Sequence, residues 1–163
     1  MSLRNTLTHR LHDTWHGSPW HGDSCDKILS GVTAEEAARQ LVPGTHTIWE
    51  IVLHLTAWTE AVCARVRGAG AKAPERGDWP AVTTTTNEAW NAVLAELEAA
   101  RKQLLDEIDA THEEEIQIHV RNHSPPFADT GLSRAGTIMG LIEHDAYHLG
   151  QIALLKRAIR ETP

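Results

Sequence analysis

Three Thr-x-x-Glu sequences stand directly before stretches with helical apolar spacing, and they constrain the fold more than any other feature of the chain. They are Thr33-Ala-Glu-Glu36, Thr47-Ile-Trp-Glu50 and Thr85-Thr-Asn-Glu88. In such a capping box the threonine hydroxyl accepts from the backbone N–H three residues on, and the glutamate accepts from the threonine N–H. The sequence therefore predicts helices that begin at defined points.

Four long segments carry apolar residues at three- and four-residue steps, which is the spacing of an amphipathic helix. We expect long helices from residue 2 to 16, from Thr47 to about Arg67, from Thr85 to about Ile108, and from about Arg134 to Ile159. Two short helices are expected between the first two long ones, one after Asp23 and one from Thr33 to about Leu41.

The longest connection without helical periodicity runs from Glu113 to Ser133. Pro125-Pro126 interrupts any helix there, and Ile116 and Ile118 suggest a short extended stretch. We expect negligible strand content elsewhere. The chain is thus predicted to be all-α, with residues 1–163 forming a single four-helix bundle that has short extra helices between its first two long helices.

Composition excludes several classes of function. The formal net charge of −7 argues against sequence-independent nucleic-acid binding, which needs clustered Lys and Arg. The apolar runs are too short to span a membrane. Cys25 and Cys63 have no paired spacing and no secretory leader precedes them, so we expect a cytoplasmic protein without a disulfide framework. A small-molecule substrate is the expected partner.

Histidine is unusually frequent, with eleven in 163 residues. Three pairs have a four-residue spacing: His12/His16, His119/His123 and His144/His148. In a chain with this many histidines such pairs also arise by chance, so the surroundings must separate them. His119/His123 precedes Ser-Pro-Pro, and His12/His16 lies at a helix end where an exposed pair is the simplest interpretation.

His144 and His148 differ from the other pairs because they lie in the middle of a helix. Residues four apart lie on one face, with Gln151 one turn further on. Imidazoles buried there without partners would cost about 1–3 kcal/mol each, a cost that a bound cation would remove. The alternative is that both are core histidines satisfied by neighbouring carbonyls or water.

A third ligand is expected from another helix, and His54 is the best candidate. It lies in the middle of the second long helix, and Glu50 stands one turn earlier, able to accept the free ring N–H or to bind the metal. Three imidazoles with open positions are typical of a catalytic zinc site, although nickel and other divalent ions also fit. His144-Asp-Ala-Tyr-His148 departs from the protease motif H-E-x-x-H at Asp145.

Other residues have weaker signals. Trp20, His21 and His46 lie in loops or at helix starts that could line the rim of a pocket, although anchoring of loops explains them equally well. Three helical tryptophans, Trp49, Trp58 and Trp90, are expected in the core. Cys63 is expected to point away from His54.

Three segments give the chain a family resemblance. They are His46-Thr-Ile-Trp-Glu-Ile-Val-Leu-His54-Leu followed by Trp58, the turn Asp78-Trp79-Pro80, and Gly140-Leu-Ile-Glu-His144-Asp-Ala-Tyr-His148-Leu-Gly-Gln151-Ile. The sequence resembles the DinB/YfiT-like family of metalloenzymes over nearly its whole length.

The resemblance implies a four-helix bundle, typically a homodimer, with a divalent metal bound by one histidine of the second helix and an HxxxH pair of the last. These positions correspond to His54, His144 and His148. Some members of the superfamily are transferases or isomerases that use glutathione, mycothiol or bacillithiol, and others are hydrolases. A low-molecular-weight thiol is therefore an expected cofactor beside zinc or nickel.

Three functions remain open from the sequence. The first is a metal-dependent enzyme, of the thiol transferase or hydrolase type, that activates a thiol or water against a small electrophile. The second is a non-catalytic metal-binding or stress-response protein. The third is a helical interaction domain in which the histidines are core residues.

Overall fold

The protein is an up-and-down arrangement of helices in a computed structural model that describes residues 2–120 and 132–161. In these ranges the helices are α1 (Leu3–Trp15), α2 (Cys25–Leu29), α3 (Ala34–Ala38), α4 (Ile48–Val66), α5 (Asn87–Ala110), the 3-10 helix η1 (Glu115–Gln117) and α6 (Arg134–Glu161). The all-α prediction is confirmed, including the two short helices between the first two long ones.

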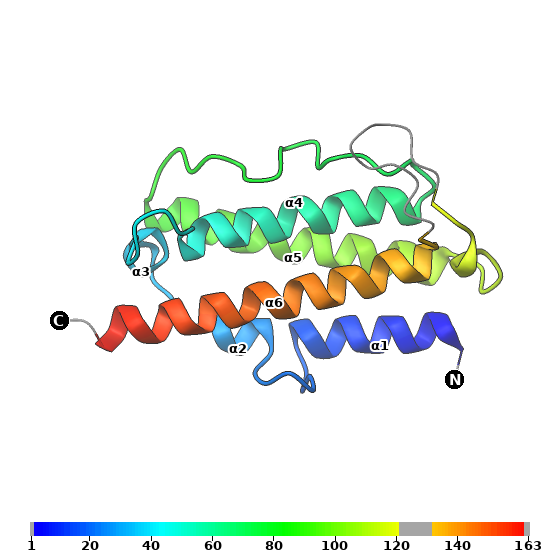
Figure 1. The fold of residues 1–163 in the computed structure, drawn as a ribbon, viewed down its shortest axis with the longest axis horizontal. Coiled ribbons are helices and arrows are strands. Elements are labelled where there is room, and N and C mark those ends of the chain that lie inside the picture. Colours follow the sequence, from blue (N-terminus) through cyan, green and yellow to red (C-terminus); the bar gives the residue numbers. More distant parts are fainter. Residues whose placement is uncertain (1, 121–131, 162–163) are drawn as a thin grey trace.

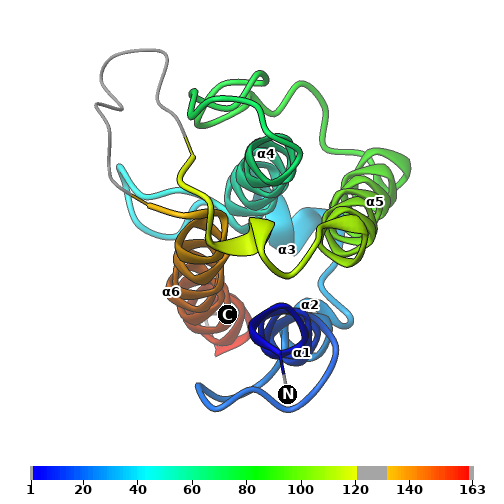
Figure 2. The same cartoon turned by 90° about the vertical axis from the view of Figure 1, so that its right-hand side faces the viewer.

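The four long helices form the corners of a bundle when the molecule is seen end-on (Figure 2). α4 packs against α5 on one side and α6 on the other, and α1 closes the ring by contacting both α5 and α6. The short α2 lies beyond the end of α1 beside α6, and α3 covers one end of the α4–α5 pair (Figure 1). α4 and α6 are therefore direct neighbours along the bundle.

Two of the three predicted capping boxes are confirmed. Thr33 and Thr47 each accept from the third helical N–H, and Glu36 and Glu50 accept from the threonine N–H. The third box is wrong by one residue, because the hydroxyl of Thr86 rather than Thr85 accepts from Ala89 N at 3.2 Å. The glutamate of that sequence then stands at the second helical position instead of the third.

Two further expectations are corrected. α3 ends at Ala38 rather than near Leu41, because the backbone of the next residue, Arg39, is extended. Ile116 lies in the 3-10 turn η1 with a fully buried side chain, so it is not extended as expected. Ile118 is extended, as predicted, and His119 next to it forms an isolated antiparallel β-bridge with Ser133.

The core confirms two of the three expected tryptophans. Trp49 and Trp90 are each 2 % exposed, with ring centroids 5.1 Å apart. Trp90 also donates its indole N–H to the Val32 carbonyl at 2.9 Å, which ties α5 to the segment between α2 and α3. In the described part of the chain no helix is both long and apolar enough to cross a membrane.

Candidate metal centre

The three histidines singled out from the sequence lie together between α4 and α6. His54 comes from α4 and is 5 % exposed, whereas His144 and His148 project from successive turns of α6. One ring nitrogen of each lies within 4.8 Å of the other two. The four-residue step of α6 places its two ring centroids 4.5 Å apart, and each lies within 5 Å of the His54 ring centroid.

The orientation of His54 is fixed by the connection between α4 and α5. Its Nδ1 lies 2.6 Å from the backbone carbonyl oxygen of Asp78, and a carbonyl only accepts, so Nδ1 carries the ring hydrogen. The ring is also stacked on Trp79, with centroids 3.9 Å apart and planes 10° from parallel. Nε2 of His54 is therefore an acceptor that faces α6.

His148 is held in the same tautomer by its own helix. Its Nδ1 lies 2.7 Å from Oε1 of Gln151, three residues further along α6. This amide oxygen is an acceptor, so Nδ1 donates and Nε2 keeps its lone pair. A ligating histidine ordinarily donates its second ring N–H to such a partner, which fixes the ring and raises its basicity. Gln151 thus has the contact expected of a residue that supports a metal ligand.

His144 faces a conflict that a cation would resolve. Its Nε2 lies 2.9 Å from Nε2 of His54, which is an acceptor, so a neutral His144 ring must carry its hydrogen on Nε2. Its Nδ1 is then a bare acceptor 3.7 Å from Oδ1 of Asp145, and both atoms are buried without a hydrogen-bond partner among the residues that the structure describes. A cation at Nε2 would shift the hydrogen to Nδ1, where it faces the carboxylate.

Burial keeps the two supported rings neutral. Desolvation lowers the pKa of His54, with a smaller lowering from the nearby His144, although the Asp78 carbonyl opposes it. Desolvation also lowers the pKa of His148 to about 4, against the opposing hydrogen bond from Gln151. At neutral pH both Nε2 atoms are thus available as ligands, because metal competes with protons for the same lone pair.

The donor set fits a first-row divalent cation. Three neutral imidazoles from two rigid helices match the ligand type and number of catalytic zinc sites, and imidazole also suits nickel. With a cation on Nε2, the ring hydrogen of His144 would lie on Nδ1, where the Asp145 carboxylate 3.7 Å away attracts it. The arrangement can therefore hold a metal ion while leaving part of its coordination sphere to another molecule.

Glu50 does not support His54, contrary to expectation. Its Oε2 accepts from the backbone N–H of Thr47 at 2.8 Å and from the Thr47 hydroxyl at 3.1 Å, so the carboxylate is turned toward the start of α4. The same oxygen lies 3.7 Å from Nδ1 of His46. Glu50 is thus part of the capping box at the start of α4. The backbone carbonyl of Asp78, rather than Glu50, accepts the ring N–H of His54.

Of the three candidate rim residues, only His46 lies near the centre. Its ring stacks on the other face of Trp79, with centroids 3.5 Å apart, so Trp79 is held between His46 and His54. Trp20 is 97 % exposed, and His21 is exposed beside it. Both belong to the turn between α1 and α2, across the bundle from α4 (Figures 1 and 2).

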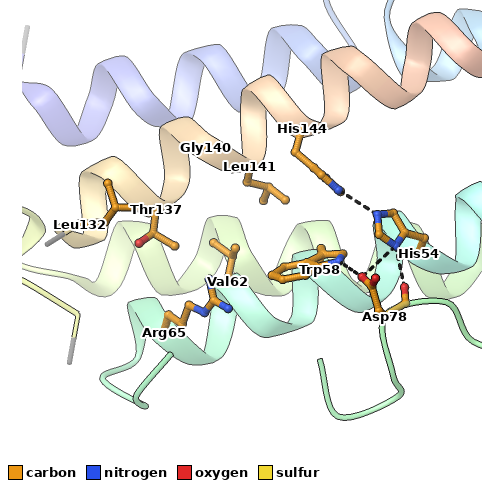
Figure 3. A pocket seen from close by; sticks show the side chains of 10 residues that line it. All are labelled: His54, Trp58, Val62, Arg65, Asp78, Leu132, Thr137, Gly140, Leu141 and His144. Atoms are coloured by element: carbon orange, nitrogen blue, oxygen red, sulfur yellow. Dashed lines mark hydrogen bonds and ion pairs between the residues drawn. The ribbon is translucent and has the colours of Figure 1, made fainter. Parts of the chain in front are cut away.

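Trp58 packs against the core from its edge and also lines the site, so the third tryptophan prediction holds only in part. It is only half-buried, lies one turn after His54 on α4, and donates its indole N–H to Oδ1 of Asp78 at 2.8 Å. Its ring centroid is 6.0 Å from that of His144 (Figure 3). Trp58 and the Asp78 side chain thus tie the α4–α5 connection to the ligand face of α4.

Two cavities adjoin the histidines from different sides. Cavity A, of about 290 Å³, lies between α4 and α6 and is lined by His54, His144 and Trp58 among others (Figure 3). Cavity B, of about 510 Å³, is lined by His46, Trp79 and His148. Each is concave, predominantly apolar and in contact with a candidate ligand, as small-molecule sites generally are.

The family comparison agrees with this arrangement. The family model of the DinB superfamily matches residues 20–152, which include α4, the first two thirds of α6 and all three histidines. The chain belongs to the DinB superfamily. No curated protein and no solved structure matches this chain. The superfamily assignment therefore supports the fold and is compatible with a metal site, and it names no reaction.

Sequence reasoning missed Asp78 as the partner of His54 and Trp79 as the ring stacked on it. The turn Asp78-Trp79-Pro80 did mark this superfamily member, but nothing local shows that it contacts a residue 24 positions away. Asp145, the residue at which the sequence departs from H-E-x-x-H, has a structural contact. It is 1 % exposed, and its Oδ2 accepts from the indole N–H of Trp15 at 2.7 Å.

Proposed function

We propose that this DinB superfamily member binds a divalent metal ion, zinc or nickel, through His54, His144 and His148, and that it is an enzyme of the thiol transferase or hydrolase type. The observation that carries the proposal is the tautomer conflict at His144. Two acceptor nitrogens converge there from α4 and α6, and a buried carboxylate stands behind the third ring.

A divalent ion held in this way supplies Lewis-acid chemistry, lowering the pKa of a water or a thiol that takes its open position. The residues around it have separate tasks. Asp78 and Gln151 keep the rings of His54 and His148 in the ligating tautomer. Trp58 and Trp79 provide flat apolar walls that exclude water from the reacting group.

Catalysis rather than storage is supported by the cavities. A site that only retains an ion is normally closed by protein ligands, whereas catalytic sites keep a position open. Here His54 and His144 line one cavity and His148 lines the other. Cys63 is buried in an apolar cluster with Val62 and Leu104, and Cys25 is buried with its Sγ 2.9 Å from Nη2 of Arg101, so neither thiol is offered to the three histidines.

The test begins with metal content. Protein purified without a histidine tag is expected to contain or take up one zinc or nickel ion per chain, measured by elemental analysis and calorimetry. The metal-loaded protein is then assayed with low-molecular-weight thiols against small electrophiles and with simple esters, with and without chelator. Turnover that chelator abolishes supports the proposal, and tight metal binding without any turnover supports the non-catalytic alternative.

A further inference from the structure

Cavity A is formed by matching faces of two neighbouring helices. From α4 it is lined by His54, Trp58 and Val62 at four-residue steps, and from α6 by Thr137, Gly140 and His144 at steps of three and four. Residues at these spacings share one face of a helix, so each wall is continuous over about two turns. The two candidate ligands stand together at one end (Figure 3).

Cavity A is short, so its far end still lies close to His54 and His144. Arg65 lines it, and its guanidinium carbon lies 5.4 Å from the centre of the Trp58 ring, while Nη2 donates to the Lys72 carbonyl at 2.8 Å. The Trp58 ring is in turn 6.0 Å from the His144 ring. One indole thus spans the distance between the two ends, and a volume of about 290 Å³ leaves room only for a small molecule.

Gly140 is the feature of cavity A that packing does not explain. A glycine inside a helix is about 1 kcal/mol less favourable than alanine. A Cβ built at Gly140 meets no atom of the described residues within 4 Å, so none of their side chains or backbone requires the glycine. It lies one turn before His144, and its missing side chain leaves the wall of cavity A open at that point.

We infer that cavity A binds the body of the electrophile, that this body is short and apolar, and that Gly140 sets its size limit. The inference rests on the proposed function and names the substrate class of the same site. Cavity A is preferred to cavity B because it contacts two of the three candidate ligands instead of one. Three large exposed hydrophobic residues, Val42, Tyr147 and Leu154, line cavity B, whereas one, Leu132, lines cavity A.

The test uses straight-chain alkyl hydroxamates, whose head group binds zinc and whose tail length can be varied from two to six carbons. With zinc-loaded protein, each methylene that enters cavity A is expected to lower Kd about fourfold, as measured by calorimetry. In Gly140→Leu this gain is expected to disappear, because the new side chain fills the cavity. Helical side chains point toward the N-terminus, so the leucine leaves the His144 ring untouched.

Gly150→Leu is the matched control. Gly150 also lies on α6 with no atom within 4 Å of a built Cβ, and it lines neither cavity. Both variants replace a helical glycine and should fold at least as stably as the parent protein. In Gly150→Leu the Kd of the hydroxamates should still fall with each added methylene. Both variants should bind zinc with the affinity of the parent protein.

The possible outcomes separate the inference from the proposed function. If zinc binds but tail length has no effect, or if the gain survives in Gly140→Leu, the inference about cavity A is wrong while the metal site stands. If zinc does not bind, the proposed function fails, and hexanol then tests the cavity alone. Hexanol should shift the Trp58 indole resonance in the parent protein and in Gly150→Leu but not in Gly140→Leu, and an equal shift in all three would overturn the inference.

Discussion

The histidine pairs on α1 and α6 have the same four-residue spacing and different surroundings. His12 is exposed, and His16 follows the last residue of α1, where its Nδ1 lies 2.8 Å from Asp26. The ring centroids of this pair are 5.5 Å apart, against 4.5 Å for the pair on α6. His119/His123 cannot be compared, since His123 lies outside the described residues.

The difference shows that spacing supplies a shared helix face and that the neighbours decide what the face can do. His16 faces carboxylates, Asp26 and Glu98, which form ion pairs with a protonated imidazole. His148 faces an amide oxygen and a second helix that brings His54, and burial favours its neutral form. One pair thus lies beside surface carboxylates, whereas the other has the neutral partners and the third imidazole that a metal site needs.

Removal of one of the three candidate ligand rings should have the largest effect on zinc affinity. We expect His54→Ala, His144→Ala and His148→Ala each to weaken zinc binding more than about 100-fold, since even the loss of a supporting partner costs about 10–100-fold. Calorimetry on the metal-free proteins measures this. His12→Ala and His16→Ala serve as controls with unchanged affinity, and an equal loss in these controls would erase the distinction between the two pairs.

Replacement of the neutral partner should have the next largest effect. Gln151→Leu removes the acceptor at 2.7 Å from Nδ1 of His148, so the ring loses its fixed tautomer. We expect zinc affinity to fall about 10–100-fold, with little change in the unfolding midpoint of the metal-free protein. Asp26→Asn, the corresponding change beside His16, should leave zinc affinity as it was. A Gln151→Leu protein with full affinity would show that the ring needs no such partner.

The pH dependence of stability should also distinguish the histidine pair on α6 from His12/His16. The pKa of His148 is about 4 in the folded protein, below its ordinary value of 6.5. Between these values the unfolded chain binds a proton that the folded protein does not, so stability falls as pH is lowered from about 6.5 to 4. Urea unfolding of the metal-free protein across this range should show the fall.

The corresponding variant makes the pH experiment specific. In His148→Gln the stability lost between pH 6.5 and 4 should shrink, whereas His16→Gln should retain it. The residual pH dependence in His148→Gln reports in part on His54, whose pKa burial also lowers. Identical pH profiles for the parent protein and His148→Gln would contradict a buried neutral ring at this position.

The smallest effect is expected from loss of the ion pair between His16 and Asp26. Asp26→Asn removes the ion pair with His16, whose side chain is 25 % exposed while that of Asp26 is 55 % exposed. Exposed pairs contribute at most about 1 kcal/mol, so the free energy of unfolding at pH 6 should fall by no more than this amount. A loss of several kcal/mol by urea unfolding would mean that the α1 pair, too, has a structural role.

Local sequence was sufficient for the elements that are built from local contacts. The capping boxes at Thr33 and Thr47 involve residues three apart, and the ligand face of α6 follows from four-residue steps. Trp58 could also have been predicted as a site residue, because it stands one turn after His54 on the same face of the helix. Its hydrophobic character favoured the core, and the indole N–H that binds Asp78 was overlooked.

The remaining part of the site depends on tertiary contacts. The Asp78 carbonyl meets His54 across 24 residues of chain, and a backbone carbonyl leaves no mark in a sequence. Glu50 was the nearest acidic residue on the helix, yet the start of α4 already required its carboxylate. Sequence reasoning therefore predicted which rings would meet but not what would hold them.

The stack of His46, Trp79 and His54 has a practical consequence for spectroscopy. The indole lies 3.9 Å from the imidazole that would hold the ion, so its fluorescence should report on the electronic structure of that ion. Nickel has a partly filled d shell that can accept excitation energy, whereas zinc, with a complete one, cannot. The emission of the purified protein should therefore fall more when nickel is bound than when zinc is bound.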